Sequence, residues 1–262
     1  MVLHSTYWFM LPISVLVATI AMLTGVGGAK FFTPLFLLAL RLKPEVAFAT
    51  ALLTQSFGFL SGLFAYASHG KINYALGIRL LVVSIPTSLL ASALGRYLPP
   101  VFLERTFALV LIILSITIHR DLKQRDSTID PDRRLSWLGP VTAGLGGSFL
   151  GLISVGLGEL LTPYFLIVKR YTYPKSIGTA VFIVFFTTLA AAAFHLFSVH
   201  SNQSAVAWQQ VLDIVIFTIP GVLIGGQIAP WLTMRADAKR MKTFLRYSFV
   251  AIGLMMLVHG PA

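Results

Sequence analysis

Cysteine is absent from this chain of 262 residues, and charged side chains are scarce. Without cysteine the protein has no disulfide, no thiolate nucleophile and no cysteine metal ligand. Only 11% of the residues are charged, against about 25% in ordinary soluble domains, while 56% are hydrophobic and the mean hydropathy is +0.84. This composition excludes an ordinary soluble enzyme and indicates a protein that crosses a membrane several times.

Acidic residues are the rarer charged class, with nine Asp and Glu against twenty Lys and Arg and a net charge of +11. In a soluble protein this excess would suggest nucleic-acid binding. Here most basic residues fall in short gaps between apolar runs, which is the pattern of loops in polytopic membrane proteins. We therefore predict an all-α polytopic membrane protein that contacts membrane lipid and binds no nucleic acid.

Motifs for catalysis and metal binding are missing as well. The chain has no HExxH motif, no paired-carboxylate motif and no Walker loop, and no His cluster or nucleophile–base pair falls within the apolar runs. His195 stands alone near the end of its run, where an interface residue is expected. We predict that the protein is not an enzyme and has no catalytic residue, no metal site and no cofactor.

The apolar runs divide the chain into ten segments. A helix needs about 20 apolar residues to cross the hydrocarbon, and only the two runs that follow glycine-rich breaks are clearly too short. We expect these two to be half-helices or short crossings surrounded by other segments, because hydrocarbon tolerates an interrupted backbone only inside protein. The runs cover residues 7–24, 29–40, 46–68, 75–98, 101–118, 135–155, 158–168, 176–199, 208–232 and 243–258.

The two halves of the chain align when one is shifted by 129 residues. No gap is needed between Val26 and Ala51, and glycine, Thr-Pro and Arg at one fixed spacing do not match by chance as apolar residues do. The matched positions are Val26-Gly27 with Val155-Gly156, Thr33-Pro34 with Thr162-Pro163, Arg41 with Arg170, and Thr50-Ala51 with Thr179-Ala180.

An odd number of segments in each half would place the second half upside down relative to the first. The expected fold is two inverted repeats of about five helical segments each, with a short or broken helix after the glycine-rich break of each half. Residues 1–118 form the first repeat, 119–134 a cytoplasmic linker and 135–262 the second repeat. Such repeats are a recurrent design of secondary transporters, which bind substrate near the midplane between them.

Both breaks have the features of an anion site. Glycine lets the backbone turn sharply and approach a ligand, and the helix that starts next points free N–H groups and its positive dipole end at the same place. Alternatively, the glycines only permit close helix packing. We favour binding because two breaks match in position. The candidate substrate-binding residues are Gly27, Gly28, Lys30, Thr33, Thr50, Gln55, Gly156, Gly158, Thr162 and Thr179.

Lys30 and Glu159 occupy the same repeat position with opposite charges. An ionisable side chain inside a span costs at least about 2.5–3.5 kcal/mol unless it is satisfied. We expect Lys30 to balance the charge of an anionic substrate and Glu159 to be a proton carrier. The alternatives are that each side chain reaches a nearby interface, or that the two form an ion pair.

Hydroxyl side chains follow each break on the next segment. Thr50 and Thr179 are related by the repeat, and Gln55 lies close to the first of them. Their hydroxyls could face a cavity and contact an oxyanion, or they could bond back to the carbonyl four residues earlier and be structural. The sequence leaves both interpretations open.

The motifs around the two breaks resemble those of the TauE/SafE family of sulfite exporters, and the resemblance covers essentially the whole chain. It implies transport of sulfur-containing anions such as sulfite, sulfonates or sulfoacetate across a bacterial inner membrane. This chain departs from the family in Lys30 and Glu159, where a glycine or small residue is common. The motifs are Gly25-Val26-Gly27-Gly28, Thr33-Pro34 and Ala49-Thr50-Ala51-Leu52, repeated as Gly156-Leu157-Gly158, Thr162-Pro163 and Gly178-Thr179-Ala180-Val181.

The leading functional hypothesis is therefore a secondary carrier of a small organosulfur or other oxyanion, coupled to a proton or sodium gradient. An anion channel that uses the same two breaks as a filter is the first alternative, and a carrier of another organic anion is the second. Direction of transport, coupling ion and oligomeric state are not encoded in any motif of this chain.

Basic residues indicate the orientation. If both short runs count as crossings, thirteen Lys and Arg lie on one side against four on the other, whereas merging each short run with its neighbour gives eleven against six. The positive-inside rule favours the first count. It places both termini outside the cell and the 119–134 linker, which contains five of the thirteen, in the cytoplasm.

The absence of cysteine makes this orientation directly testable. A single cysteine at Ser127, within the linker, should resist membrane-impermeant thiol reagents in intact spheroplasts and should react once the membrane is opened. The unmodified protein is the control, because it offers no thiol. Rapid labelling of intact spheroplasts would contradict the ten-segment assignment.

Overall fold

The structure is a computed structural model, and it describes residues 7–24, 28–95, 137–202 and 205–235 together with scattered residues between 105 and 116 and between 237 and 254. The predicted linker 119–134 lies outside this part of the chain. Within it, every regular element is a helix. They are α1 (Met10–Thr24), α2 (Ala29–Pro34), η2 (Leu35–Ala39), α3 (Pro44–Ser68), α4 (Tyr74–Leu94), α6 (Leu138–Ile153), α7 (Leu157–Pro163), η4 (Tyr164–Val168), α8 (Tyr173–Asn202) and α9 (Ala205–Arg235).

These helices confirm the predicted all-α polytopic fold. The two short runs are filled by α2 with η2 and by α7 with η4, and each of the other helices coincides with one predicted apolar run within a few residues at either end. The described residues of runs 101–118 and 243–258 are also helical. Four helices are long and apolar enough to cross a membrane, namely α3, α4, α8 and α9. The element boundaries follow local chemistry: Pro44 begins α3, and the Asn73 side chain accepts the Leu76 N–H at the start of α4.

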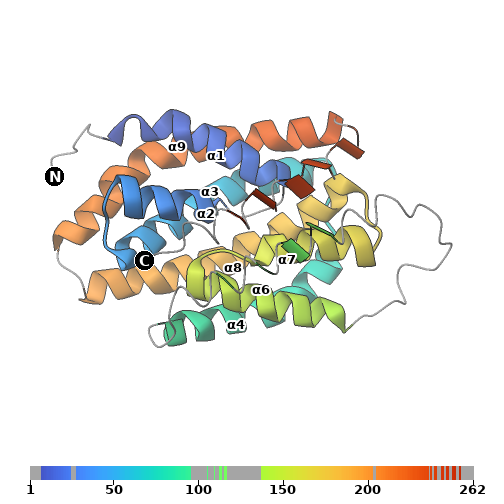
Figure 1. Ribbon diagram of the computed structural model, residues 1–262, viewed down its shortest axis with the longest axis horizontal. Helices are drawn as coiled ribbons and strands as arrows, with labels where there is room; N and C mark the ends of the chain where they lie inside the picture. The colour runs from blue at the N-terminus through green and yellow to red at the C-terminus, as the bar shows by residue number, and fades with distance from the viewer. Residues whose placement is uncertain are drawn as a thin grey trace.

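The pair α3 and α8 forms the centre of the bundle. In each, 72% of the apolar stretch is buried, against 28% in α4. Around this pair the contacts cross between the halves: α1 packs on α9 and α6 on α4, while α3 contacts α9 and α8 contacts α4. Figure 1 shows α3, α8 and α9 running along the long axis of the molecule. The inverted relation of the two repeats stays a prediction.

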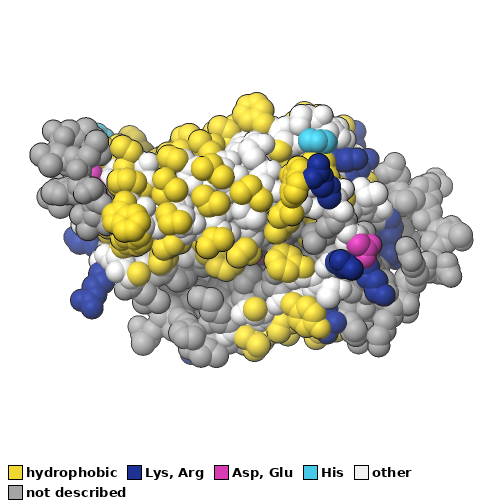
Figure 2. All heavy atoms as spheres, turned by 90° about the horizontal axis from the view of Figure 1, so that it is seen from above, with side chains coloured by type: hydrophobic (Ala, Val, Ile, Leu, Met, Phe, Trp, Pro, Cys, Tyr) yellow, Lys and Arg dark blue, Asp and Glu magenta, His cyan; other side chains and the backbone are white. Residues whose placement is uncertain are grey.

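The outer face is apolar over most of its length. Leu16 and Ile20 on α1, and Ile224 and Trp231 on α9, are exposed, and Figure 2 shows the resulting hydrophobic face with Lys and Arg at both ends. A continuous apolar face of this kind is typical of a surface that contacts lipid tails. The exposed side chains therefore belong to the membrane-facing surface rather than to a misplaced core.

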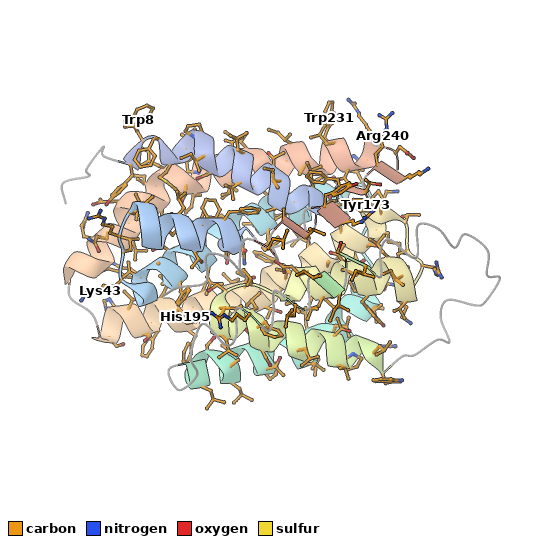
Figure 3. All side chains as sticks on the ribbon, in the orientation of Figure 1. Trp8, Lys43, Tyr173, His195, Trp231 and Arg240 are labelled. Carbon is orange, nitrogen blue, oxygen red and sulfur yellow. The ribbon has the colours of Figure 1, made fainter. Side chains whose placement is uncertain are left out.

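Two basic residues that the ten-segment assignment puts on different sides of the membrane lie far apart in the structure. Lys43 and Arg240 lie at opposite ends of the long axis, with Trp8 near the first and Tyr173 near the second (Figure 3). Counting only eight crossings would have placed Lys43 and Arg240 on one side. Which end faces the cytoplasm stays a prediction.

Glycine pairs spaced by four residues lie where helix backbones meet. A Cβ at Gly147 would stand 2.6 Å from the Ser84 carbonyl oxygen on α4, and one at Gly221 would stand 2.5 Å from the Leu11 carbonyl oxygen on α1. At Gly151 a Cβ would overlap the Ser88 carbonyl oxygen. Small residues permit this close approach of helices in a membrane, so these glycines serve helix packing.

We predict that Gly151→Ala destabilises the protein and that Gly144→Ala on the same helix does not. A Cβ at Gly144 meets its nearest neighbour, a methyl group of Val83, at 3.4 Å, which is an ordinary contact. The overlap at Gly151 should cost about 1–3 kcal/mol. Thermal unfolding of the purified proteins in detergent measures the difference, and equal melting temperatures for the two variants would refute the packing role.

Candidate functional site

The two breaks share one backbone design. Each short helix continues into a π-helical turn, η2 in the first half and η4 in the second, and each ends at an arginine with a positive φ, 51° at Arg41 and 53° at Arg170. Both arginines are followed by a 3.0 Å backbone bond, from Leu42 N to Phe36 O and from Tyr171 N to Phe165 O. The offset is 129 residues throughout, so the sequence repeat is also a repeat of conformation.

This shared conformation is unusual. A non-glycine residue rarely adopts a positive φ, and π-helical turns are rare elements that recur at functional sites. Because two segments combine both features at matched positions, this conformation is a specific feature of the fold and not a chance irregularity. The breaks are the part of the fold to which function is most readily assigned.

Glu159 holds the second break together. The chain leaves α6 at Ser154 with a φ of 62° and turns again at Gly156 with a φ of 121°. The buried Glu159 carboxylate accepts the Gly156 N–H at 3.0 Å. A carboxylate at this position satisfies an amide that has no partner within the helix and complements the helix dipole. Glu159 therefore caps α7, and its predicted proton-carrier role stays a prediction.

In the first half, Gln55 on α3 caps the short helix α2. Its Oε1 accepts the Ala29 N–H at 2.7 Å at the start of α2, and its Nε2 donates to Thr188 Oγ1 on α8 at 3.4 Å. Gln55 is 2% exposed. The predicted site residue Gln55 thus lies at the first break and links α2 to both central helices, α3 and α8.

Thr33 has a buried hydroxyl that lacks a hydrogen-bond partner. The side chain is 8% exposed, and the hydroxyl oxygen makes no hydrogen bond within the described part of the chain. Its repeat mate Thr162 is fully buried and does have an interaction partner. Buried polar groups without a partner are rare in native structures and call for an explanation such as ligand binding.

Thr50 and Thr179 differ despite their symmetry. Thr50 donates to the Val46 carbonyl at 2.7 Å, the structural bond to the residue four positions earlier. Thr179 makes the same kind of bond to Lys175 at 2.8 Å and also accepts the Asn73 N–H at 3.1 Å. These contacts match the structural interpretation of both threonines, and Thr179 in addition anchors the start of α4.

The remaining predicted site residues lie at the same two breaks. Gly28 is buried just before α2, in an ordinary right-handed conformation, and Gly158 is buried in the first turn of α7. Gly27 and the side chain of Lys30 lie outside the described residues, and so does any Lys30–Glu159 contact.

Sequence reasoning overlooked two partners. Thr188 meets Gln55, and Asn73 meets both Thr179 and Tyr171, whose hydroxyl accepts from the Asn73 amide at 2.8 Å. Neither belongs to a break motif: Thr188 is a polar residue within run 176–199, and Asn73 lies just before run 75–98. Among the described residues, no group of three His, Asp or Glu side chains could hold a metal ion.

Comparison with known proteins agrees with this architecture. Residues 10–256 match the family model described as "Sulfite exporter TauE/SafE". The chain is 22% identical to "Probable membrane transporter protein YunE" of Bacillus subtilis (strain 168), over 97% of this chain and 98% of that protein. It is 27% identical to "Probable membrane transporter protein YjnA" of the same organism, over 81% and 86%. No solved structure matches. The chain therefore belongs to the TauE/SafE family of membrane transporters.

Proposed function

We propose that this transporter carries a small sulfur-containing anion, such as sulfite, a sulfonate or sulfoacetate, and that the anion binds at the two breaks near the middle of the membrane. The family supports transport as the activity, and the substrate class follows from the family's printed description together with the chemistry of the site. We place the protein in a bacterial inner membrane, with linker 119–134 in the cytoplasm.

The observation that carries this proposal is the unpartnered hydroxyl of Thr33 at a duplicated helix break. A buried donor without a partner costs about 1–3 kcal/mol, and a bound oxyanion would offset this cost by accepting the hydrogen bond. The substrate would then replace a partner that the protein does not supply.

Charge distinguishes the two halves. At the second break the Glu159 carboxylate already accepts the N–H of Gly156, just before α7, so an added anion there would meet a like charge. At the first break the matched residue is Lys30, and the acceptor from Gln55 is neutral. The first half is therefore the more favourable place for the negative charge of the substrate.

Thr33→Val should weaken sulfite binding while preserving the fold. Valine keeps the shape of threonine and removes only the hydroxyl, so loss of one hydrogen bond of about 1–1.5 kcal/mol corresponds to roughly a tenfold weaker affinity. The assay is counterflow of labelled sulfite in proteoliposomes, with competition by unlabelled sulfonates. The matched control is Thr142→Val, whose hydroxyl donates to the Leu138 carbonyl of the same helix.

Failure of the unmodified protein to exchange any sulfur oxyanion would remove the substrate assignment. Normal exchange by Thr33→Val would move the site away from α2. A channel would pass sulfite without accumulating it under an imposed ion gradient, so gradient-driven accumulation by the unmodified protein separates a carrier from a channel.

The charged pair makes a second prediction. Lys30→Gln should weaken sulfite binding, because a charge-assisted contact is lost. Glu159→Gln should retain binding, since an amide oxygen can still accept the Gly156 N–H. It should make transport less dependent on pH, because an amide cannot titrate. Melting temperatures of the single and double variants test the ion-pair alternative. A coupling free energy above about 1 kcal/mol would favour that pair over the division of roles.

A further inference from the structure

A line of polar side chains connects α4, α8 and the end of α6. Ser84, Ser88 and Ser92 follow one another at intervals of four on α4, and Thr187 and His195 lie eight residues apart on α8. We call these five residues the serine seam. Residues four apart lie on one face of a helix. The seam contacts α8 at Ser84 and the end of α6 at Ser92 and His195.

The first contact of the seam joins Ser84 to Thr187. Ser84 Oγ lies 2.8 Å from Thr187 Oγ1, and Thr187 donates its own proton to the Ile183 carbonyl, so Ser84 is the donor. The next residue on α8, Thr188, contacts Gln55, which accepts the first amide of α2. The α8 residue that contacts Ser84 therefore precedes, in the sequence, the α8 residue that contacts Gln55.

The seam ends at the last turn of α6. The Gly151 carbonyl is one of the final four of that helix and has no acceptor role within it. It accepts the Ser92 hydroxyl at 3.2 Å and lies 3.4 Å from His195 Nε2, which must carry a proton to donate to a carbonyl. Between these contacts, the Ser88 hydroxyl is fully buried and has no hydrogen-bond partner in the described part of the chain.

We propose that His195 is a proton-binding residue of this transporter, which couples protonation to the α6–α7 break through the Gly151 carbonyl. The inference rests on the proposed anion transport and adds a protonation site to it. Histidine is the side chain that ordinarily titrates between pH 5 and 8. His195 is partly exposed and lies towards the Lys43 end of the molecule in Figure 3.

Protonation would act on a defined bond. The incoming proton adds to Nδ1, since Nε2–H already faces Gly151, and the imidazole becomes a cation without any other bond changing. The Nε2–H bond to the carbonyl then becomes charge-assisted, and the positive charge lies at the negative end of the α6 dipole. Proton binding thus tightens α8 onto the end of α6, three residues before Ser154, where the break begins.

No other described titratable group bonds to His195, whose remaining ring contact is Phe194 at 5.9 Å between centroids. The packed helices α1 and α6 contain no titratable side chain. Asp213 on α9 accepts from Gln209 at 2.9 Å instead. The other titratable residues of the packed elements are Glu45 and Tyr66 on α3, Tyr74 and Arg79 on α4, Glu159 on α7, Tyr164 on η4, Tyr173, Lys175 and His200 on α8, and Arg235 on α9.

The test compares His195→Gln with His200→Gln in the full-length protein. Glutamine can still donate to Gly151 but cannot titrate, and His200 is an exposed histidine on the same helix that contacts Trp208. In proteoliposomes, His195→Gln should reduce accumulation of labelled sulfite driven by a pH gradient at least about fivefold, while counterflow of sulfite at equal pH stays close to wild type. His200→Gln should change neither rate.

A second measurement needs no substrate. The melting temperature of the wild-type protein should vary between pH 5 and 8. This variation should be smaller in His195→Gln and in His195→Asn, the second of which serves if the first folds poorly. Ser92→Ala should retain it. If wild-type protein transports no sulfite, the proposed function fails while this measurement still tests His195. Unchanged pH dependence of both melting and accumulation in the His195 variants would overturn the proposal.

Discussion

A helix that starts inside hydrocarbon exposes amide groups for which the lipid offers no acceptor. In this protein each short helix has a buried side-chain acceptor for such an amide, Gln55 at the start of α2 and Glu159 just before α7. Both acceptors are almost completely buried. Without them one backbone amide at the start of each short helix would have no hydrogen-bond acceptor. The position of the π-helical turn and of the positive-φ arginine that follow would then be less well fixed.

The two capping residues differ in which helix they come from. Glu159 belongs to the helix that it caps, so the start of α7 is set locally. Gln55 belongs to α3 and also contacts Thr188 on α8, so the start of α2 is tied to the central helix pair. The two halves therefore share a backbone and hold their short helices differently. Under the proposed function, this asymmetry would favour the first half as the place for the negative charge of the substrate.

Hydroxyl side chains and glycines hold the long helices together. Lipid tails are as apolar as the helices, so helix association relies on close packing and interhelical hydrogen bonds rather than on hydrophobic burial. Thr54 and Thr218 bridge α3 to α9 at 2.9 Å, and Ser84 and Thr187 bridge α4 to α8 at 2.8 Å. These two bridges join equivalent helix pairs, as the crossed contacts between the halves require.

Hydropathy, glycine placement and the repeat spacing of 129 residues predicted the helices, the two breaks and the membrane class, because these depend on composition and local backbone preference. The partners of individual side chains were not predictable. Thr50 and Thr179 are equivalent in sequence, yet only Thr179 meets Asn73, since Asn73 comes from the other half of the chain. Likewise Gln55 was identifiable as a site residue, while its role as a cap arises only because α2 folds back against α3. Local sequence sets where a helix begins and breaks, and the packing of distant segments sets which polar groups satisfy each other.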